Sequence, residues 1–203
     1  TIQGEGPFAG SRALFLRLAG CNLQCPGCDT DYTNNRRFLP VPELIKNIQK
    51  IVRPPYLVVV TGGEPFRQDI TKFCNMLERM GYVVQIETNG SYAPSPYLHP
   101  RICIVCSPKT GSINAEMARR ADFFKYVLHS DSVSRTDGLP ILALDHTAIP
   151  YVARPSAGKK IYLQPMDCKN EAVNRHNIEA VRKSCMEFGY ILQLQIHKII
   201  GVE

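Results

Sequence analysis

The chain has 203 residues, of which 44% are hydrophobic and 21% charged, enough for one globular domain with its own core. No stretch approaches the roughly 18 consecutive apolar residues of a membrane span. The chain opens on Thr-Ile-Gln-Gly-Glu-Gly rather than a charged-then-apolar leader. We therefore predict a cytoplasmic protein with a single domain over residues 1–203. Because Thr1 is not an initiator Met, we expect a few natural residues to be missing before it.

The charge pattern argues against a nucleic-acid partner. The formal net charge is +6, but the basic residues are scattered from Arg12 to Lys198 without a long run or an interleaved aromatic tract. Small acidic ligands are the better expectation. Eight cysteines in a chain without a leader favour metal or redox chemistry over a disulfide framework, since the cytosol keeps thiols reduced.

Short apolar runs alternate with amphipathic helical patterns along the chain. Strands are predicted, in order, at 13–18, 56–61, 82–87, 102–106, 123–128, 160–164 and 191–195. Three helical faces lie between them: Leu44, Ile45, Ile48, Ile51 and Val52; Ile70, Phe73, Cys74, Leu77 and Met80; and Ile178, Val181, Cys185 and Phe188. This alternation predicts an α/β fold with a mainly parallel sheet and flanking helices, whether open or closed. Its polar motifs follow the strands, so we expect one shared site at their carboxyl ends.

Three cysteines are clustered in the loop after the first predicted strand. Cys21, Cys25 and Cys28 have C-x3-C-x2-C spacing, which lets their thiolates surround one inorganic cluster. Structural zinc normally takes four protein ligands, whereas a four-iron, four-sulfur cluster held by three cysteines leaves one iron open. The spacing therefore favours a catalytic cluster. A zinc site with a distant fourth ligand, His99 or His129, is the alternative.

The remaining cysteines are interpreted as structural. Cys103 and Cys106 are three residues apart on one predicted strand, so their side chains point to opposite faces and cannot chelate one ion. Cys74, Cys168 and Cys185 are isolated in the sequence and are expected to be small buried hydrophobic residues.

The segment Thr61-Gly62-Gly63-Glu64-Pro65 follows the second predicted strand. Its two glycines permit unusual dihedrals and a close approach of the backbone to a ligand, and Glu64 can accept hydrogen bonds from an ammonium group. A simple strand-to-helix turn is the alternative interpretation of this segment alone. Together with the three cysteines, the turn resembles the radical S-adenosylmethionine (SAM) superfamily.

Further short motifs are similar to those of the 7-carboxy-7-deazaguanine synthase family. They are residues 1–6, Arg17, residues 28–30, 87–90, 107–109 and 164–167, and the pair His197 and Lys198. Each string is weak alone, but their order and spacing run from the first residue nearly to the last. The resemblance implies a modified, incomplete (β/α) barrel.

The resemblance also implies a reaction and its cofactors. Members convert 6-carboxy-5,6,7,8-tetrahydropterin into 7-carboxy-7-deazaguanine with loss of ammonia, a carbon–nitrogen lyase reaction on the route to queuosine and other 7-deazapurines. They use a [4Fe-4S] cluster, SAM and Mg2+, usually as homodimers, with an electron donor such as flavodoxin. The small-molecule pterin would be the partner, with no nucleic acid and no membrane.

Site residues follow from the resemblance position by position. Cys21, Cys25 and Cys28 would hold the cluster, and Thr30 would contribute to Mg2+ binding with substrate oxygens or water completing the shell. The SAM site would comprise Gly27, Cys28, Asp29, Gly63, Glu64, Gly90, Ser107, Pro108, Lys109, Gln164, Pro165, Met166 and Asp167. The pterin site would comprise Ile2, Gln3, Gly4, Arg17, Thr88 and the C-terminal Glu203.

Two of these substrate assignments differ in chemical fit. Arg17 suits a planar, bidentate pair with the pterin carboxylate, although a structural ion pair is the alternative. Glu203 would place a second negative charge beside an acidic ligand, which requires a nearby cation. His197 would orient the substrate or simply complete the end of the last strand.

Two other functions compete with this one. Another small radical SAM enzyme, such as a glycyl-radical activase, would share the cysteines and the Gly-Gly-Glu-Pro turn. A zinc-dependent nucleic-acid module would explain the charge and the cysteines without catalysis.

Overall fold

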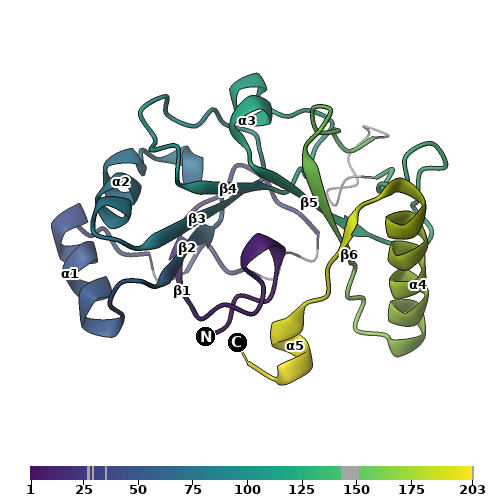
Figure 1. Ribbon diagram of the computed structural model, residues 1–203, viewed down its shortest axis with the longest axis horizontal. Helices are drawn as coiled ribbons and strands as arrows, with labels where there is room; N and C mark the ends of the chain where they lie inside the picture. Colours follow the sequence, from purple (N-terminus) through teal and green to yellow (C-terminus); the bar gives the residue numbers. More distant parts are fainter. Residues whose placement is uncertain (27, 29, 35, 143–150, 203) are drawn as a thin grey trace.

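Seven parallel strands form one open sheet, and they lie in it in the order of the sequence. The computed structural model describes residues 1–26, 28, 30–34, 36–142 and 151–202. The strands are β1 (Ala13–Leu18), β2 (Leu57–Gly62), β3 (Val83–Thr88), β4 (Cys103–Cys106), β5 (Phe123–Leu128), β6 (Lys160–Pro165) and β7 (Ile191–Leu192). Each strand pairs in parallel with the next, and the curved sheet stops short of closing into a barrel (Figure 1). This open curved sheet confirms the predicted α/β class.

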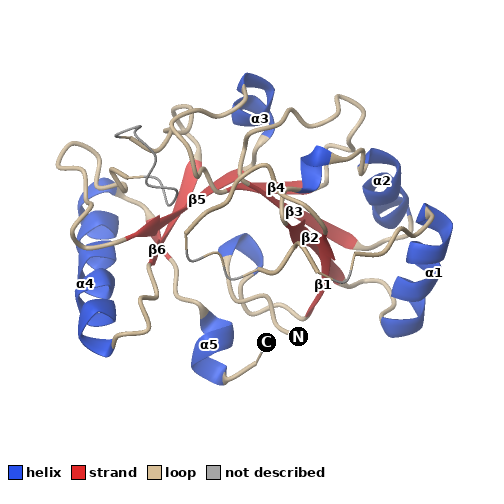
Figure 2. Cartoon of the chain, turned by 180° about the vertical axis from the view of Figure 1, so that it is seen from behind, coloured by secondary structure: helices blue, strands red, loops and turns tan. Residues whose placement is uncertain are grey.

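Helices cover the convex face of the sheet (Figure 2). They are α1 (Val41–Ile51), α2 (Thr71–Arg79), α3 (Ala115–Arg120) and α4 (Glu171–Phe188). The long helix α4 begins where the Asn170 side chain accepts a hydrogen bond from the Val173 N–H, and it ends at Gly189 with a left-handed φ of 76°. No helix among the described residues is long and apolar enough to cross a membrane.

Strand alternation sorts the side chains onto two faces. On β5, Phe124, Tyr126 and Leu128 join the buried core under the helices. Lys125 lies between them in sequence and therefore points to the concave face. The same alternation turns Gln85 and Glu87 of β3 and Gln164 of β6 to that concave side. The sheet thus carries an apolar face and, near its carboxyl end, a polar one.

The two ends of the chain meet over the concave face. The 3-10 helix η1 (Gly6–Phe8) and the short helix α5 (Ile196–Ile200) lie in front of the sheet, near the two termini (Figure 1). The Ile196 N–H donates to the Gly4 carbonyl at 3.2 Å, and the Gly6 N–H donates to Gln193 Oε1 at 2.8 Å. These bonds join the segments that flank the outer strands β1 and β7.

The last strand is shorter than the sequence predicts. A strand is expected at 191–195, but β7 spans Ile191–Leu192 only. The Gln193 N–H still donates to the Leu163 carbonyl of β6 at 3.0 Å, but beyond it the chain turns into α5. The buried Gln193 side chain bonds the N-terminal segment, with Nε2 donating to the Gly4 carbonyl at 3.2 Å. The helices α3 and α5, which the periodicity does not indicate, have only six and five residues.

Candidate active site

The cysteine loop leaves the carboxyl end of β1 and is tied back on itself. The Gly20 N–H donates to the Tyr32 carbonyl at 3.0 Å, and the Tyr32 hydroxyl donates to the Leu23 carbonyl at 3.0 Å. Cys28 is exposed, while Cys21 and Cys25 are half-buried. Gly27 and Asp29, both predicted to contact SAM, lie outside the described residues.

The three thiols share one local environment. Burial raises the pKa of the Tyr32 hydroxyl, and the nearby thiols of Cys21, Cys28 and Cys25 raise it further, because negative charge opposes a second anion. The Leu23 N–H donates to Cys21 Sγ at 3.4 Å. Thiols on one loop with such N–H donors suit an iron–sulfur cluster, whose potential depends on hydrogen bonds to sulfur. Among the described residues, no three His, Cys, Asp or Glu side chains converge on a single point.

Backbone hydrogen bonds join the Gly-Gly-Glu-Pro turn to the residues that lead into the cysteine loop. The Gly63 N–H donates to the Leu18 carbonyl at 3.0 Å, and the Glu64 N–H donates to the Gly20 carbonyl at 2.9 Å. A Cβ at Gly62 would lie 2.3 Å from Leu18 N. Both glycines are therefore required by protein backbone passing directly over them, a contact that the sequence interpretation assigned to a ligand.

Glu64 faces the protein interior. Its side chain is fully buried, and it accepts hydrogen bonds from the Thr88 hydroxyl at 2.7 Å, the Asn89 N–H at 2.7 Å and the Phe66 N–H at 3.0 Å. Burial raises the pKa of Glu64 despite these donors. In this conformation the carboxylate fixes the loop after β3, and its contact with SAM stays a prediction.

That loop reaches back to the cysteines. The Asn89 side chain donates to Asn22 Oδ1 at 3.0 Å and lies 4.0 Å from Cys21 Sγ. Gly90 follows with a left-handed φ of 84°, and a Cβ there would lie 2.7 Å from Cys106 Sγ. Thr88, predicted to contact the pterin, is buried, and its hydroxyl oxygen also accepts from the Gly90 N–H at 3.1 Å.

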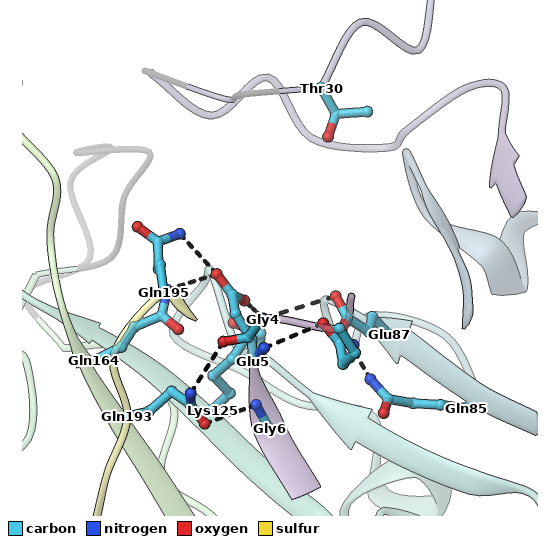
Figure 3. A network of polar contacts seen from close by, with 12 residues as sticks. Gly4, Glu5, Gly6, Thr30, Gln85, Glu87, Lys125, Gln164, Gln193 and Gln195 are labelled. Carbon is cyan, nitrogen blue, oxygen red and sulfur yellow. Dashed lines mark hydrogen bonds and ion pairs between the residues drawn. The ribbon is translucent and has the colours of Figure 1, made fainter. Parts of the chain in front are cut away.

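A charged network fills the concave face beside this loop. Lys125 forms an ion pair with Glu5, and its Nζ lies 3.7 Å from Glu87 Oε2. Four glutamine side chains donate hydrogen bonds to these two carboxylates. Gln195 and Gln164 donate to Glu5 Oε1 at 2.7 and 3.4 Å. Gln3 and Gln85 donate to Glu87 Oε1 at 3.1 and 2.8 Å. Figure 3 shows the two groups on either side of Lys125.

The electrostatics of this network keep Glu5 ionised. Burial by itself raises the pKa of Glu5, but the charge and hydrogen bond of Lys125, with a hydrogen bond from Gln195, together lower it to about 2. For the cationic Lys109, burial has the opposite effect and lowers the pKa, and the charge of Lys125 lowers it further. Lys109 donates to the Ser107 hydroxyl at 2.6 Å.

Arg17 and Thr30 lie together at the rim of the site. The exposed Arg17 guanidinium donates from Nη1 to Thr30 Oγ1 at 3.3 Å, and it lies over the Phe15 ring at 5.7 Å. Thr30 stands on the loop above the charged network (Figure 3). The predicted pterin-carboxylate ligand and the predicted Mg2+ ligand are therefore neighbours.

The comparisons with known proteins cover this whole arrangement. A family model of the radical SAM superfamily matches residues 16–96, which include the cysteine loop and the glycine turn. The 7-carboxy-7-deazaguanine synthase of Rhodospirillum rubrum is 39% identical over 100% of this chain and 89% of its own. That of Rickettsia prowazekii is 33% identical over 100% of this chain and 86% of its own.

This chain belongs to the 7-carboxy-7-deazaguanine synthase family. The crystal structure of QueE from Escherichia coli has the same fold, with a TM-score of 0.68 and 23% identity over 96% of this chain and 90% of that one. The two rival functions, a different radical SAM enzyme and a zinc-dependent nucleic-acid module, are not favoured by matches of this length. His99 and His129 also lie beside acidic partners, 3.6 Å from Glu78 and 3.9 Å from Asp131.

The other positions carried over from the 7-carboxy-7-deazaguanine synthase family are distributed around the network. Gln3 is buried and Gly4 packs on His197, because a Cβ at Gly4 would lie 1.8 Å from His197 Nδ1. Ile2 pairs with Arg12 in an isolated antiparallel bridge. Pro108 is buried and Pro165 is half-buried. Glu203 lies outside the described residues, and its pterin contact stays a prediction.

The end of the 164–167 motif is hydrogen-bonded to β5 and to α5. The Met166 N–H donates to the Leu128 carbonyl at 2.9 Å, and Asp167 accepts from Lys198 Nζ at 2.6 Å. The Lys198 hydrogen bond and others from Lys169 and Asn174 hold the pKa of Asp167 well below its usual range. Asp167 thus joins β6 to α5, and its contact with SAM stays a prediction.

Sequence reasoning assigned no role to the charged centre of the site. Glu5 and Glu87 lie inside motifs that resemble those of the family, but the motifs by themselves do not indicate either as a site residue. Lys125 was missed altogether, although a signal exists, because it interrupts the apolar strand Phe-Phe-Lys-Tyr-Val-Leu. A lysine in the middle of such a strand needs a buried partner.

The structural cysteines largely match expectation. Cys74, Cys106 and Cys185 are buried, and Cys103 lies on the opposite face of β4 from Cys106. Cys168 is the exception, since it is half-buried and accepts a hydrogen bond from Asn177 at 3.6 Å. A separate cleft of about 870 Å3 runs between α4 and the segment after β5, and it contains none of the predicted site residues.

Proposed function

We propose that this protein converts 6-carboxy-5,6,7,8-tetrahydropterin into 7-carboxy-7-deazaguanine and ammonia, as a radical SAM lyase of queuosine and related 7-deazapurine biosynthesis. The observation that carries this proposal is the placement of the three-cysteine loop over a buried, charged concave face. The glycine turn of Gly62 and Gly63 holds that loop in place. The full-length similarity to named 7-carboxy-7-deazaguanine synthases supports the substrate.

Cys21, Cys25 and Cys28 would bind the [4Fe-4S] cluster as thiolates, leaving one iron for the amino and carboxylate groups of SAM. When bound, the cluster and SAM supply a carbon-centred radical that removes hydrogen from the substrate. The chain's part is to place the substrate carbon against that radical and to exclude water. We assign SAM to the rim formed by residues 27–29, Gly63, Glu64, Gly90, residues 107–109 and residues 164–167.

Glu64 has a positioning role in this proposal. Its buried carboxylate fixes the Thr88 hydroxyl and the Asn89 N–H, and Asn89 in turn contacts the cysteine loop. These hydrogen bonds therefore link the turn after β2 and the loop after β3 to the cysteine loop. A change in the position of one of these loops would therefore alter ligand binding on the other.

The pterin would lie on the concave face between the cysteine loop and the charged network. Arg17 would pair with its carboxylate, and Ile2, Gln3, Gly4, Thr88 and Glu203 would surround the ring. Thr30 would bind Mg2+ together with substrate oxygens, since one hydroxyl cannot fill an octahedral shell. Arg17 donates to Thr30 Oγ1, and the second lone pair of that hydroxyl oxygen would be left for the metal. We further infer a cytoplasmic homodimer that receives electrons from a flavodoxin-like donor.

The decisive experiment is anaerobic reconstitution followed by incubation with SAM, a reductant, Mg2+ and the carboxytetrahydropterin. The expected result is about four irons and four sulfides per chain and formation of 7-carboxy-7-deazaguanine. SAM cleavage without this product would favour another radical SAM activity, such as glycyl-radical activation. One zinc per chain, without iron or sulfide, would contradict the cluster itself. Cys28→Ala should lose the cluster, while the matched control Cys103→Ala should keep it.

A further inference from the structure

The concave face holds a surplus of buried hydrogen-bond acceptors around one lysine. Lys125 is 7% exposed and lies between the carboxylates of Glu5 and Glu87. Among the described residues, the amide oxygens of Gln164 and Gln85 are buried without a hydrogen-bond partner. Gln164 Nε2 is directed to Glu5 at 3.4 Å, so its free oxygen belongs to the same cluster.

Burying a carbonyl oxygen without a partner costs folding free energy, because the oxygen loses its hydrogen bonds to water. A ligand that donates N–H groups would restore those bonds. The carboxylates strengthen this preference, because ionised acceptors form the stronger hydrogen bonds with N–H donors. The polarity of the site therefore specifies a ligand edge rich in donors.

Lys125 explains how two carboxylates persist side by side in a buried site. Two like charges in a region of low dielectric repel each other, and one of them would otherwise be protonated. A protonated carboxyl is no longer purely an acceptor. The ammonium group of Lys125 offsets this repulsion, while the four glutamine donors orient the carboxylates.

A buried ion pair is by itself weak support for stability, because apolar side chains of similar volume often serve as well. This makes a positioning role the better account of Lys125. Lys125 lies on β5 two residues before Val127, and Val127 is paired with Gln164 of β6. A strand fixes the position of the ammonium group more firmly than a loop would.

We propose that Lys125 is a positioning residue that holds Glu5 and Gln164 as an acceptor pair for the amino-pyrimidinone edge of the pterin. The pair accepts hydrogen bonds from the 2-amino group and the adjacent ring N–H. These groups lie at the opposite end of the ligand from the carboxylate assigned to Arg17. This inference rests on the proposed function and deepens it. It moves Gln164, grouped by family resemblance with the SAM-contacting residues, to the substrate side, and leaves residues 165–167 of that motif on the SAM rim.

The test compares two ligands on the SAM-loaded, reconstituted enzyme by calorimetric titration. They are 6-carboxypterin and its analogue in which hydrogen replaces the 2-amino group. Wild type should bind 6-carboxypterin about tenfold or more tightly than the analogue, the size expected of a charge-assisted hydrogen bond. Lys125→Met should bind both ligands alike, with its SAM affinity unchanged, and Lys125→Arg should restore part of the preference. Lys160→Met, an exposed lysine on the neighbouring strand β6, should behave as wild type.

Turnover provides a second readout. Lys125→Met should raise KM for the carboxytetrahydropterin about tenfold while kcat changes little, because an edge contact binds ground state and transition state alike. An unchanged KM, or a preserved preference for the 2-amino ligand, would overturn the inference. If Lys125→Met does not fold, Glu5→Gln replaces it, since the amide keeps an acceptor for Lys125 but loses the charge. A wild-type preference retained in Glu5→Gln would also overturn it.

The wild-type control separates this inference from the proposed function. If wild type neither binds 6-carboxypterin nor turns over the carboxytetrahydropterin, the proposed function fails and the edge assignment falls with it. If wild type does both and the variants keep its preference, only the role of Lys125 fails.

Discussion

Gly63 lies directly against the backbone of Gly20, so closely that a Cβ at Gly63 would stand 2.0 Å from the Gly20 carbonyl oxygen. The same carbonyl accepts the Glu64 N–H at 2.9 Å. Gly20 immediately precedes the first cluster cysteine, so the path of the cysteine loop depends on the missing side chain at Gly63.

Gly63→Ala should therefore damage the cluster site while leaving the fold intact. Overpacking against backbone should cost about 1–3 kcal/mol of unfolding free energy and displace Cys21. We expect a folded protein by circular dichroism that reconstitutes markedly less iron than wild type. Gly158→Ala is the control for backbone strain without a steric contact, because an alanine is strained at its left-handed φ of 80° but nothing lies within 4 Å of the added Cβ. Full iron content in Gly63→Ala would show that the loop adapts.

The Glu5 carboxyl should make stability depend on pH in acid. Its folded pKa of about 2 lies below the ordinary 4.5, so its contribution is present above pH 4.5 and is lost as pH falls toward 2. The difference corresponds to about 3 kcal/mol. Urea unfolding between neutral and acid pH should show a steeper loss of stability for wild type than for Glu5→Gln. Parallel curves would mean that Glu5 has no such shift.

Alkylation should separate the cluster cysteines from the structural ones. Burial raises the pKa of Cys74, Cys103 and Cys106 to about 12. At pH 8 only about one in ten thousand of these thiols is ionised, so iodoacetamide should not modify them in the folded protein. The cysteines of the loop, led by the exposed Cys28, should react in the cluster-free protein and be protected after reconstitution. Peptide mass spectrometry gives the result, and rapid native labelling of Cys106 would contradict it.

Thr30→Ala should reduce turnover without removing the cluster. Loss of the hydroxyl removes a Mg2+ ligand, and we expect turnover to fall on the order of tenfold through poorer substrate placement. The brown charge-transfer absorption should be unchanged. Thr33→Ala, on the same loop, is the control, because its hydroxyl bonds Asp31 instead. Unchanged Mg2+-dependent activity in Thr30→Ala would exclude Thr30 as a metal ligand.

The sequence determined the elements whose signal is local. The strands at 13–18 and 123–128 have the predicted bounds, because each is a short apolar run. The family followed from short strings in a fixed order. The strand predicted at 191–195 is too long, since the chain turns into α5 after Gln193. The Gln193 side chain bonds the Gly4 carbonyl 189 residues earlier, and no local pattern reports such a contact.

Only the tertiary structure decided what the polar residues do. The glycine turn was expected to approach a ligand, and it packs on Gly20. Glu64, whose contact with SAM stays a prediction, is buried against Thr88 and Asn89. Glu5 and Lys125 are 120 residues apart and form one ion pair. The sequence specifies which groups carry charge, but their partners depend on chain folding, because electrostatic and hydrogen-bond energies are set by distances of a few ångströms.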